Sequence, residues 1–84
     1  MSRAEIEQAV LDSLTSVAPE IDRASLQPDV PLRDQTDLDS MDFLRFVVEL
    51  HRRLAIDVPE ADYGKLTTVA AATDYLASRS PSTS

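Results

Sequence analysis

The sequence contains no cysteine, which excludes a disulfide, a thiolate metal site and a protein thiol that could act as a nucleophile. It has only one glycine and 5% aromatic residues, a composition that does not suit a small sheet protein with many turns. We therefore expect helices, and any thiol chemistry must come from an added group.

Long apolar runs are missing as well. No segment approaches the length needed to span a bilayer, and residues 1–5 lead directly into an amphipathic pattern without the apolar stretch of a signal peptide. These features predict a cytoplasmic protein that does not associate with membranes. At 84 residues, the chain fits a single domain that is too small to enclose a large active site.

Basic residues are outnumbered, with 8 Lys and Arg against 15 Asp and Glu, so the formal net charge is -7. This charge repels nucleic acids and anionic lipid surfaces. We expect partner proteins with basic patches and no nucleic-acid partner. Acidity that provides only solubility is the alternative.

The first helix is predicted from apolar residues at helical spacing, namely Ile6, Val10, Leu14 and Val17. Ser2 and Glu5 form the S-x-x-E capping box expected at its start, and Pro19 ends it. A long connection follows from about residue 20 to residue 39, with a short turn expected near Asp22. Connections of this length in small domains are more often functional or partly structured than idle.

A second helix is predicted from Ser40 to Leu54, with Asp39 as the residue that caps its first amides. At about 100° per residue its apolar side chains fall on two adjoining faces. We assign one face to the core, consisting of Phe43, Phe46, Val47, Leu50 and Leu54. The other face contains Met41, Leu44 and Val48, and we expect it to be an exposed or gating patch that contacts partners, unless the bundle covers both faces.

Two shorter segments complete the predicted fold. A short helix is expected over residues 60–65, beginning after Pro59 and ending at Gly64. Thr67 or Thr68 is expected to cap a final helix that runs through Leu76. The sequence thus predicts an all-α domain over residues 1–77, in which three longer helices and one short helix form a bundle with a long loop between the first and second helices. Residues 78–84 form a tail expected to be disordered.

The segment Asp37-Leu38-Asp39-Ser40-Met41-Asp42 places a serine at the start of a helix, after a long loop. Free backbone amides and the positive end of the helix dipole stabilise a negative group there, so a phosphodiester on the serine oxygen would be favourably placed. An ordinary helix cap is the alternative. The neighbouring aspartates would repel a bare phosphate unless a cation such as Mg²⁺ compensates for them during modification.

From Ile6 to Leu76 the sequence resembles the acyl carrier protein family. The resemblance is carried by Asp39-Ser40-Met41-Asp42, which is similar to the family's attachment motif, and by Pro31-Leu32 upstream. Downstream it continues in residues 54–59 and 66–69, which resemble the entry to the family's third helix and the start of its fourth. The tetrapeptide alone is a weak signal, but this ordered set is specific.

The resemblance implies a small acyl-carrier-like bundle with 4'-phosphopantetheine attached to Ser40 and with Asp39 as the second cofactor-binding residue. A phosphopantetheinyl transferase would install the group from coenzyme A and would need Mg²⁺ only for that step. Other implied partners are enzymes that load and transfer acyl groups in fatty-acid, polyketide or related lipid synthesis, and the carrier is expected to act as a monomer. The residues expected to contact partners are Met41, Asp42, Leu44, Arg45 and Val48.

Three features bear on how much of the family pattern applies here. The glycine that commonly precedes the attachment serine by three residues is Asp37 here. Met41 replaces a leucine, which changes shape rather than polarity. The second helix carries three arginines among its acidic residues, namely Arg45, Arg52 and Arg53, which puts the usual partner set in doubt unless they simply pair with Asp42 and Glu49.

No catalytic set accompanies Ser40, and we expect neither catalytic residues nor a resident metal. His51, the only histidine, lies about 16 Å further along the same helix, too far for a hydrogen bond to Ser40. The chain is therefore interpreted as a carrier and not an enzyme. Two alternatives stay open, namely an aminoacyl or peptidyl carrier for a specialised pathway and a carrier-like interaction module that is never modified.

Overall fold

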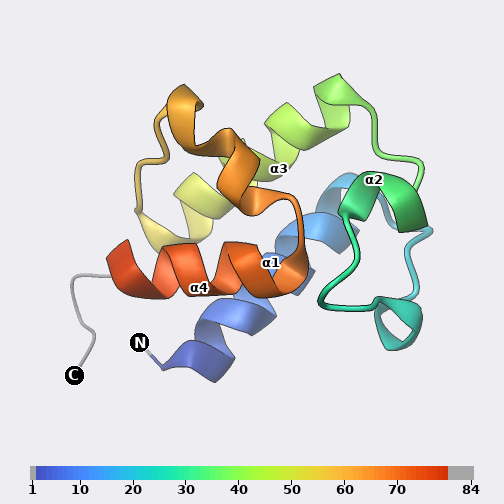
Figure 1. Cartoon of the computed structure of the whole chain (residues 1–84), viewed down its shortest axis with the longest axis horizontal. Helices are drawn as coiled ribbons and strands as arrows, with labels where there is room; N and C mark the ends of the chain where they lie inside the picture. The colour runs from blue at the N-terminus through green and yellow to red at the C-terminus, as the bar shows by residue number, and fades with distance from the viewer. Residues whose placement is uncertain (1, 80–84) are drawn as a thin grey trace.

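The computed structural model of the chain describes residues 2–79, and in that range it contains helices and no strands (Figure 1). This confirms the predicted all-α fold. In chain order the elements are α1 (Arg3–Val17), the 3-10 helix η1 (Arg23–Ser25), α2 (Leu32–Gln35), α3 (Ser40–Leu54), the 3-10 helix η2 (Glu60–Leu66) and α4 (Val69–Arg79).

The predicted start of α1 is confirmed in atomic detail. The Glu5 amide donates to Ser2 Oγ at 3.2 Å, and the Glu5 carboxylate accepts from the Ser2 amide at 3.0 Å. The helix ends at Val17, two residues before Pro19, as expected from the missing amide hydrogen of proline. The expected turn near Asp22 is η1, and the Asp22 side chain accepts from the Ala24 amide at 3.1 Å.

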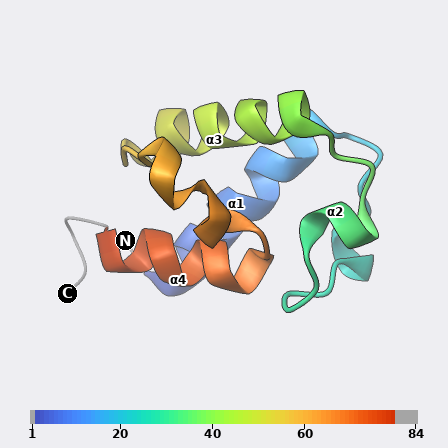
Figure 2. The ribbon, with the colours of Figure 1, turned by 45° about the horizontal axis from the view of Figure 1, so that its top comes forward.

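The three longer helices enclose one apolar core. Both α3 and α4 contact α1, and Figure 2 shows α3 lying above the other two. The apolar stripe predicted for each helix faces inward, because only that side can be removed from water. The fully buried core side chains on these helices are Ile6, Val10, Leu14, Phe46, Leu50, Ala72 and Leu76.

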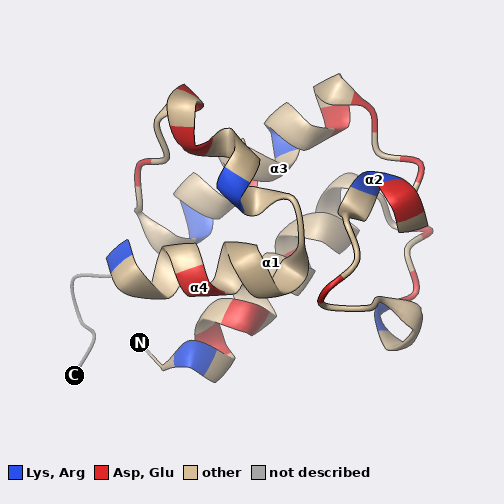
Figure 3. Cartoon of the chain, in the orientation of Figure 1, with Lys and Arg blue, Asp and Glu red and all other residues tan. Residues whose placement is uncertain are grey.

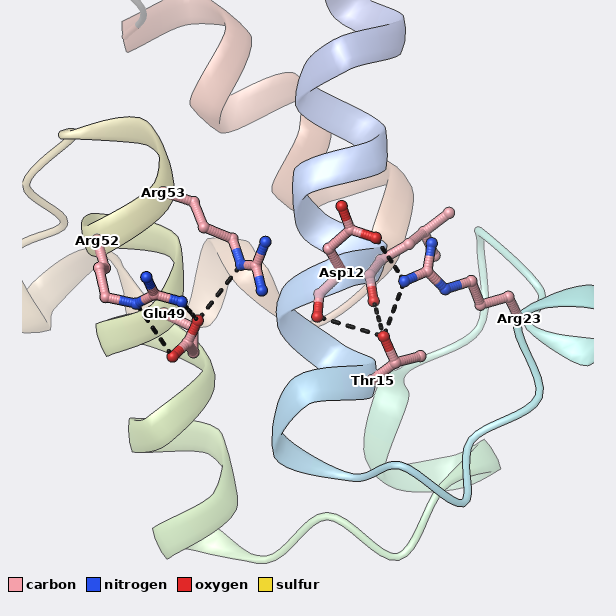
Figure 4. A network of polar contacts seen from close by, with 7 residues as sticks. Asp12, Thr15, Arg23, Glu49, Arg52 and Arg53 are labelled. Atoms are coloured by element: carbon pink, nitrogen blue, oxygen red, sulfur yellow. Dashed lines mark hydrogen bonds and ion pairs between the residues drawn. The ribbon is translucent and has the colours of Figure 1, made fainter.

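Arg23 of η1 ties the long connection to α1. Its guanidinium donates to the Asp12 carboxylate and, at 2.8 Å, to the Thr15 hydroxyl (Figure 4). The hydrogen bond from Arg23 lowers the pKa of Asp12 below its usual range, so the pair is ionised at neutral pH. The beginning of the connection is therefore fixed against α1.

The later part of the connection contains α2, a single helical turn that the sequence did not predict. Its first residue, Leu32, is buried, and the Leu32 amide donates to the Thr67 carbonyl at 2.8 Å. The Pro28 carbonyl accepts from the Ala70 amide at 3.0 Å. These two bonds hold the connection against the start of α4, so its shape depends on residues far away in the chain.

The short helix predicted over residues 60–65 is η2, but the prediction that Gly64 ends it is wrong. Gly64 lies inside η2, which continues to the buried Leu66. A glycine ends a helix when it adopts the left-handed conformation, and no glycine in the described residues does so. The left-handed position is Ala55, which follows α3 with φ of 56°.

The last helix begins as predicted, and the structure selects Thr68 as the capping residue, since its hydroxyl accepts from the Ala71 amide at 2.9 Å. Because α4 continues to Arg79, Ser78 and Arg79 of the predicted tail are helical. The rest of that tail, residues 80–84, lies outside the described residues. Within residues 2–79, none of the helices has both the length and the apolar character needed to cross a membrane.

Candidate functional site

Ser40 is the first residue of α3, and its side chain is exposed at the end of the long connection. Asp39 and Asp42 fix the first turn of α3 through two hydrogen bonds. Asp39 accepts from the Asp42 amide at 2.8 Å, and the Asp42 carboxylate accepts from the Asp39 amide at 3.5 Å. The predicted cap at Asp39 is therefore confirmed, and Asp42 completes a reciprocal capping box that the sequence analysis did not identify.

The electrostatics at Ser40 combine two opposing effects. The amides of Ser40 and Met41 lie in the first turn, where no intrahelical acceptor exists, and together with the helix dipole they favour an anion. Asp37, Asp39 and Asp42 lie close in sequence and favour a cation. In the described part of the chain, no three or more acidic or histidine side chains form a group that could hold a metal ion.

His51 is at the opposite end of α3 from Ser40. Its Nδ1 lies 3.1 Å from an Asp57 carboxylate oxygen and 3.3 Å from the Ile56 carbonyl oxygen. These contacts place the imidazole where α3 ends. It therefore cannot remove a proton from Ser40, as the sequence spacing predicted.

A groove of about 670 Å³ opens beside Ser40. It is lined by residues from α2, from the end of the connection, from the first turns of α3 and from η2. Its lining is mostly apolar and consists of Pro31, Leu32, Arg33, Leu38, Asp39, Ser40, Phe43, Leu44, Glu60, Tyr63, Gly64 and Thr67. An apolar groove next to a reactive hydroxyl provides space for a flexible attached group.

Phe43 of α3 and Tyr63 of η2 line this groove and contact each other. Their ring centroids are 5.9 Å apart in an edge-on arrangement, which is favourable for aromatic pairs. Phe43, assigned to the core by its spacing, is half-buried, and it also contacts Phe46, with 6.0 Å between the ring centroids. Tyr63 has no sequence signal that marks it as a groove residue, because its place in the groove depends on how η2 packs against α3.

The outer face of α3 is apolar, as its spacing predicted. Met41 is 62% exposed, Leu44 is 44% exposed and Val48 is 64% exposed, whereas Phe46 and Leu50 are fully buried. The three exposed side chains follow Ser40 along the helix, and Leu44 also reaches the groove. The division of α3 into a buried face and an exposed face is confirmed; its role in partner binding stays a prediction.

Acidic and basic residues both occur along α3 (Figure 3), and Glu49 pairs with Arg52 and Arg53 (Figure 4). Arg52 and Arg53 both donate to Glu49, with closest distances of 2.8 and 3.3 Å, and the hydrogen bond from Arg52 lowers the pKa of Glu49. Arg45 approaches Asp42 only to 3.9 Å. The local pairing expected from helical spacing is present, and Arg45 is the arginine least constrained by it.

Comparisons with known proteins add independent evidence. Residues 8–76 match the protein family described as "Phosphopantetheine attachment site". The chain is 32% identical over 78 residues to the acyl carrier protein of Lactobacillus johnsonii, a match that covers 93% of this chain and 96% of that protein. It is 29% identical over 76 residues to the acyl carrier protein of Rubrobacter xylanophilus, covering 90% and 93% of the two chains.

Proposed function

This chain belongs to the acyl carrier protein family, and from that premise we propose that it holds acyl groups as thioesters on 4'-phosphopantetheine attached to Ser40. The observation that carries the proposal is the placement of an exposed serine hydroxyl at the first turn of α3, beside an apolar groove. The sequence contains no cysteine, so the attached group would supply the thiol on which cargo is held.

The residues around Ser40 fit such a group. The first-turn amides of α3 favour the phosphodiester, and the exposed hydroxyl is open to a transferase. In the attachment step, Ser40 Oγ would form a bond to the phosphorus that carries the pantetheine arm of coenzyme A. The bond from that phosphorus to the departing nucleotide would break, and the hydroxyl proton would pass to the transferase. Mg²⁺ supplied during this step would offset the nearby carboxylates.

The exposed apolar face of α3 is the surface that we propose partners contact. Met41, Leu44 and Val48 would make the apolar contacts, and Asp42 and Arg45 would select partners by charge. These partners would include a phosphopantetheinyl transferase and enzymes that load or transfer acyl groups in fatty-acid, polyketide or related synthesis. We place the carrier in the cytoplasm, and we propose that it has no catalytic activity of its own.

Intact-protein mass spectrometry tests attachment directly. The full chain is incubated with coenzyme A, Mg²⁺ and a broad phosphopantetheinyl transferase, and it should gain the mass of one phosphopantetheine group. Ser40→Ala should gain none, whereas Ser16→Ala, which removes another exposed serine on α1, should be modified like the wild type. Modification that persists in Ser40→Ala would disprove the assignment. Failure of every variant to gain mass would favour an unmodified interaction module.

A further inference from the structure

Asp62 lies on the side of η2 that faces α4, although the residue next to it, Tyr63, lines the groove. The Asp62 side chain is only 16% exposed. It accepts a hydrogen bond from the Tyr75 hydroxyl at 2.6 Å and from Arg79 at 3.1 Å, and both donors belong to α4. Lys65 Nζ lies 3.5 Å from the other carboxylate oxygen. One carboxylate therefore connects η2 to α4 through two donors, and Lys65 of η2 itself adds a third positive or polar neighbour.

The aromatic ring of Tyr75 strengthens the same junction. Tyr75 is buried, and the Arg79 guanidinium lies 4.8 Å from the centre of its ring, within the range of a cation–π contact. The hydrogen bond from Tyr75 lowers the pKa of Asp62, so the carboxylate is charged at neutral pH. Arg79 can thus interact with the Asp62 carboxylate and with the ring that donates to it.

η2 needs such a connection because its own backbone stabilises it poorly. It is a 3-10 helix of seven residues, whereas 3-10 runs longer than about four residues are uncommon because their hydrogen bonds are strained. It also contains Gly64, which adds backbone freedom. The position of η2 is therefore set by its tertiary contacts, and Figure 2 shows it lying between α3 and α4.

We propose that Asp62 is the positioning residue for the groove beside Ser40. By holding η2 on α4, it keeps Tyr63 against Phe43 and so fixes the part of the groove wall that these two rings form. The inference rests on the proposed function for its biological meaning, since the groove would shelter the cargo held on Ser40. The role of Asp62 in holding η2 does not depend on the proposed function, because every contact involved is made within the unmodified chain.

The test uses the full, unmodified chain and the variant Asp62→Asn. Asp74→Asn is the matched control, since it makes the same substitution on α4 at a side chain that is 66% exposed and pairs with Arg3. Two NMR measurements are made on each protein, namely hydrogen exchange of the backbone amides and the ring-to-ring nuclear Overhauser effect between Phe43 and Tyr63.

In Asp62→Asn, the amides of residues 63–66 should exchange about tenfold faster, because the acceptor loses its charge and its hydrogen bonds to Tyr75 and Arg79 weaken. The Phe43–Tyr63 signal should weaken, while α1 and α3 amides keep their protection. Asp74→Asn should match the wild type in both measurements. Unchanged exchange in η2 together with an unchanged ring signal in Asp62→Asn would overturn the inference.

A second variant covers the case in which Asp62→Asn loses its fold, which would appear as lost protection in α1 and α3. Tyr75→Phe removes only the hydroxyl donor, and it should change both measurements in the same direction by a smaller factor. No change in Tyr75→Phe would then overturn the inference.

The link to cargo is tested separately, with the chain loaded with an octanoyl thioester and exposed to hydroxylamine. Asp62→Asn should lose the thioester faster than Asp74→Asn, because a looser groove protects it less. Equal rates would show that Asp62 does not govern access to the cargo. If the chain accepts no arm at all, the proposed function fails, while the measurements on the unmodified chain still decide the role of Asp62.

Discussion

Leu44→Ala and Leu50→Ala remove the same atoms from the same helix, yet the structure predicts different costs for them. Leu50 is fully buried between the helices, whereas Leu44 is 44% exposed on the outer face of α3. Truncating a fully buried leucine removes its transfer free energy and also leaves a cavity. Truncating a half-exposed leucine leaves no enclosed cavity, and part of the lost side chain was already in water.

The magnitudes follow from these burials. Leu50→Ala should lower the free energy of unfolding by about 2–5 kcal/mol. Leu44→Ala should lower it by about 1 kcal/mol or less, from roughly half the transfer term. For a domain of this size, each 1 kcal/mol shifts the melting temperature by about 4–8 °C. A cost near 3 kcal/mol at Leu50 therefore lowers it by roughly 12–24 °C, a large part of the margin of a marginally stable domain.

Urea unfolding followed by far-UV circular dichroism measures both costs. The same pair is then compared in the arm-attachment reaction, at a temperature where both variants are folded. Leu44→Ala should lower kcat/KM for the transferase by about tenfold if this side chain is a main contact, while Leu50→Ala leaves it nearly unchanged. If Leu44→Ala destabilises the domain as much as Leu50→Ala, the outer face is packed in solution, and the partner surface must be sought in the loop before Ser40.

Three further outcomes follow from single contacts. Asp39→Ala should lower the free energy of unfolding by about 1 kcal/mol in a denaturant titration. Asp39→Asn keeps an acceptor for the Asp42 amide, so it should lose much less stability. Equal losses in the two variants would mean that this hydrogen bond is unimportant. Gly64→Ala should raise the free energy of unfolding by about 0.4–1 kcal/mol, because the new Cβ meets nothing within 4 Å and the backbone of Gly64 is not left-handed. A lower melting temperature in Gly64→Ala would contradict the placement of Gly64 inside η2. The pKa of Asp62 is lowered in the folded chain, so its stabilising contribution is complete above the unfolded pKa of about 4 and is lost as the pH falls through the lower folded value. The stability difference between the wild type and Asp62→Asn, measured by urea unfolding, should therefore be largest near neutral pH and shrink in acid; a difference independent of pH would exclude a role for the charge.

The helices whose signals are local were predicted closely. Ser2 and Glu5 mark the start of α1 by bonding to each other, and Asp39 marks the start of α3 in the same way. The apolar period of α3 also separates the buried Leu50 from the exposed Leu44. These signals are readable because partners three or four residues apart on a helix must meet, whatever the rest of the chain does.

The structures that the sequence did not reveal depend on distant partners. The turn α2 contains four residues and is held by a bond from Leu32 to Thr67, so it has no periodicity of its own. Gly64 was wrongly predicted to end its helix, because a glycine fits a helix end without requiring one. Tyr63 lines the groove because η2 packs against α3, which no local pattern in the sequence indicates.

The sequence alone determined that this is a small helical carrier-like domain with its candidate attachment serine at the start of a helix. Composition excluded a protein thiol, and the local capping signals placed Ser40 at the first turn. Only the tertiary structure decided that an apolar groove lies beside Ser40 and that Asp62 connects its wall to Tyr75, 13 residues away. The physical reason is that capping and periodicity act within one helical turn, whereas a groove exists only between elements that the whole fold brings together.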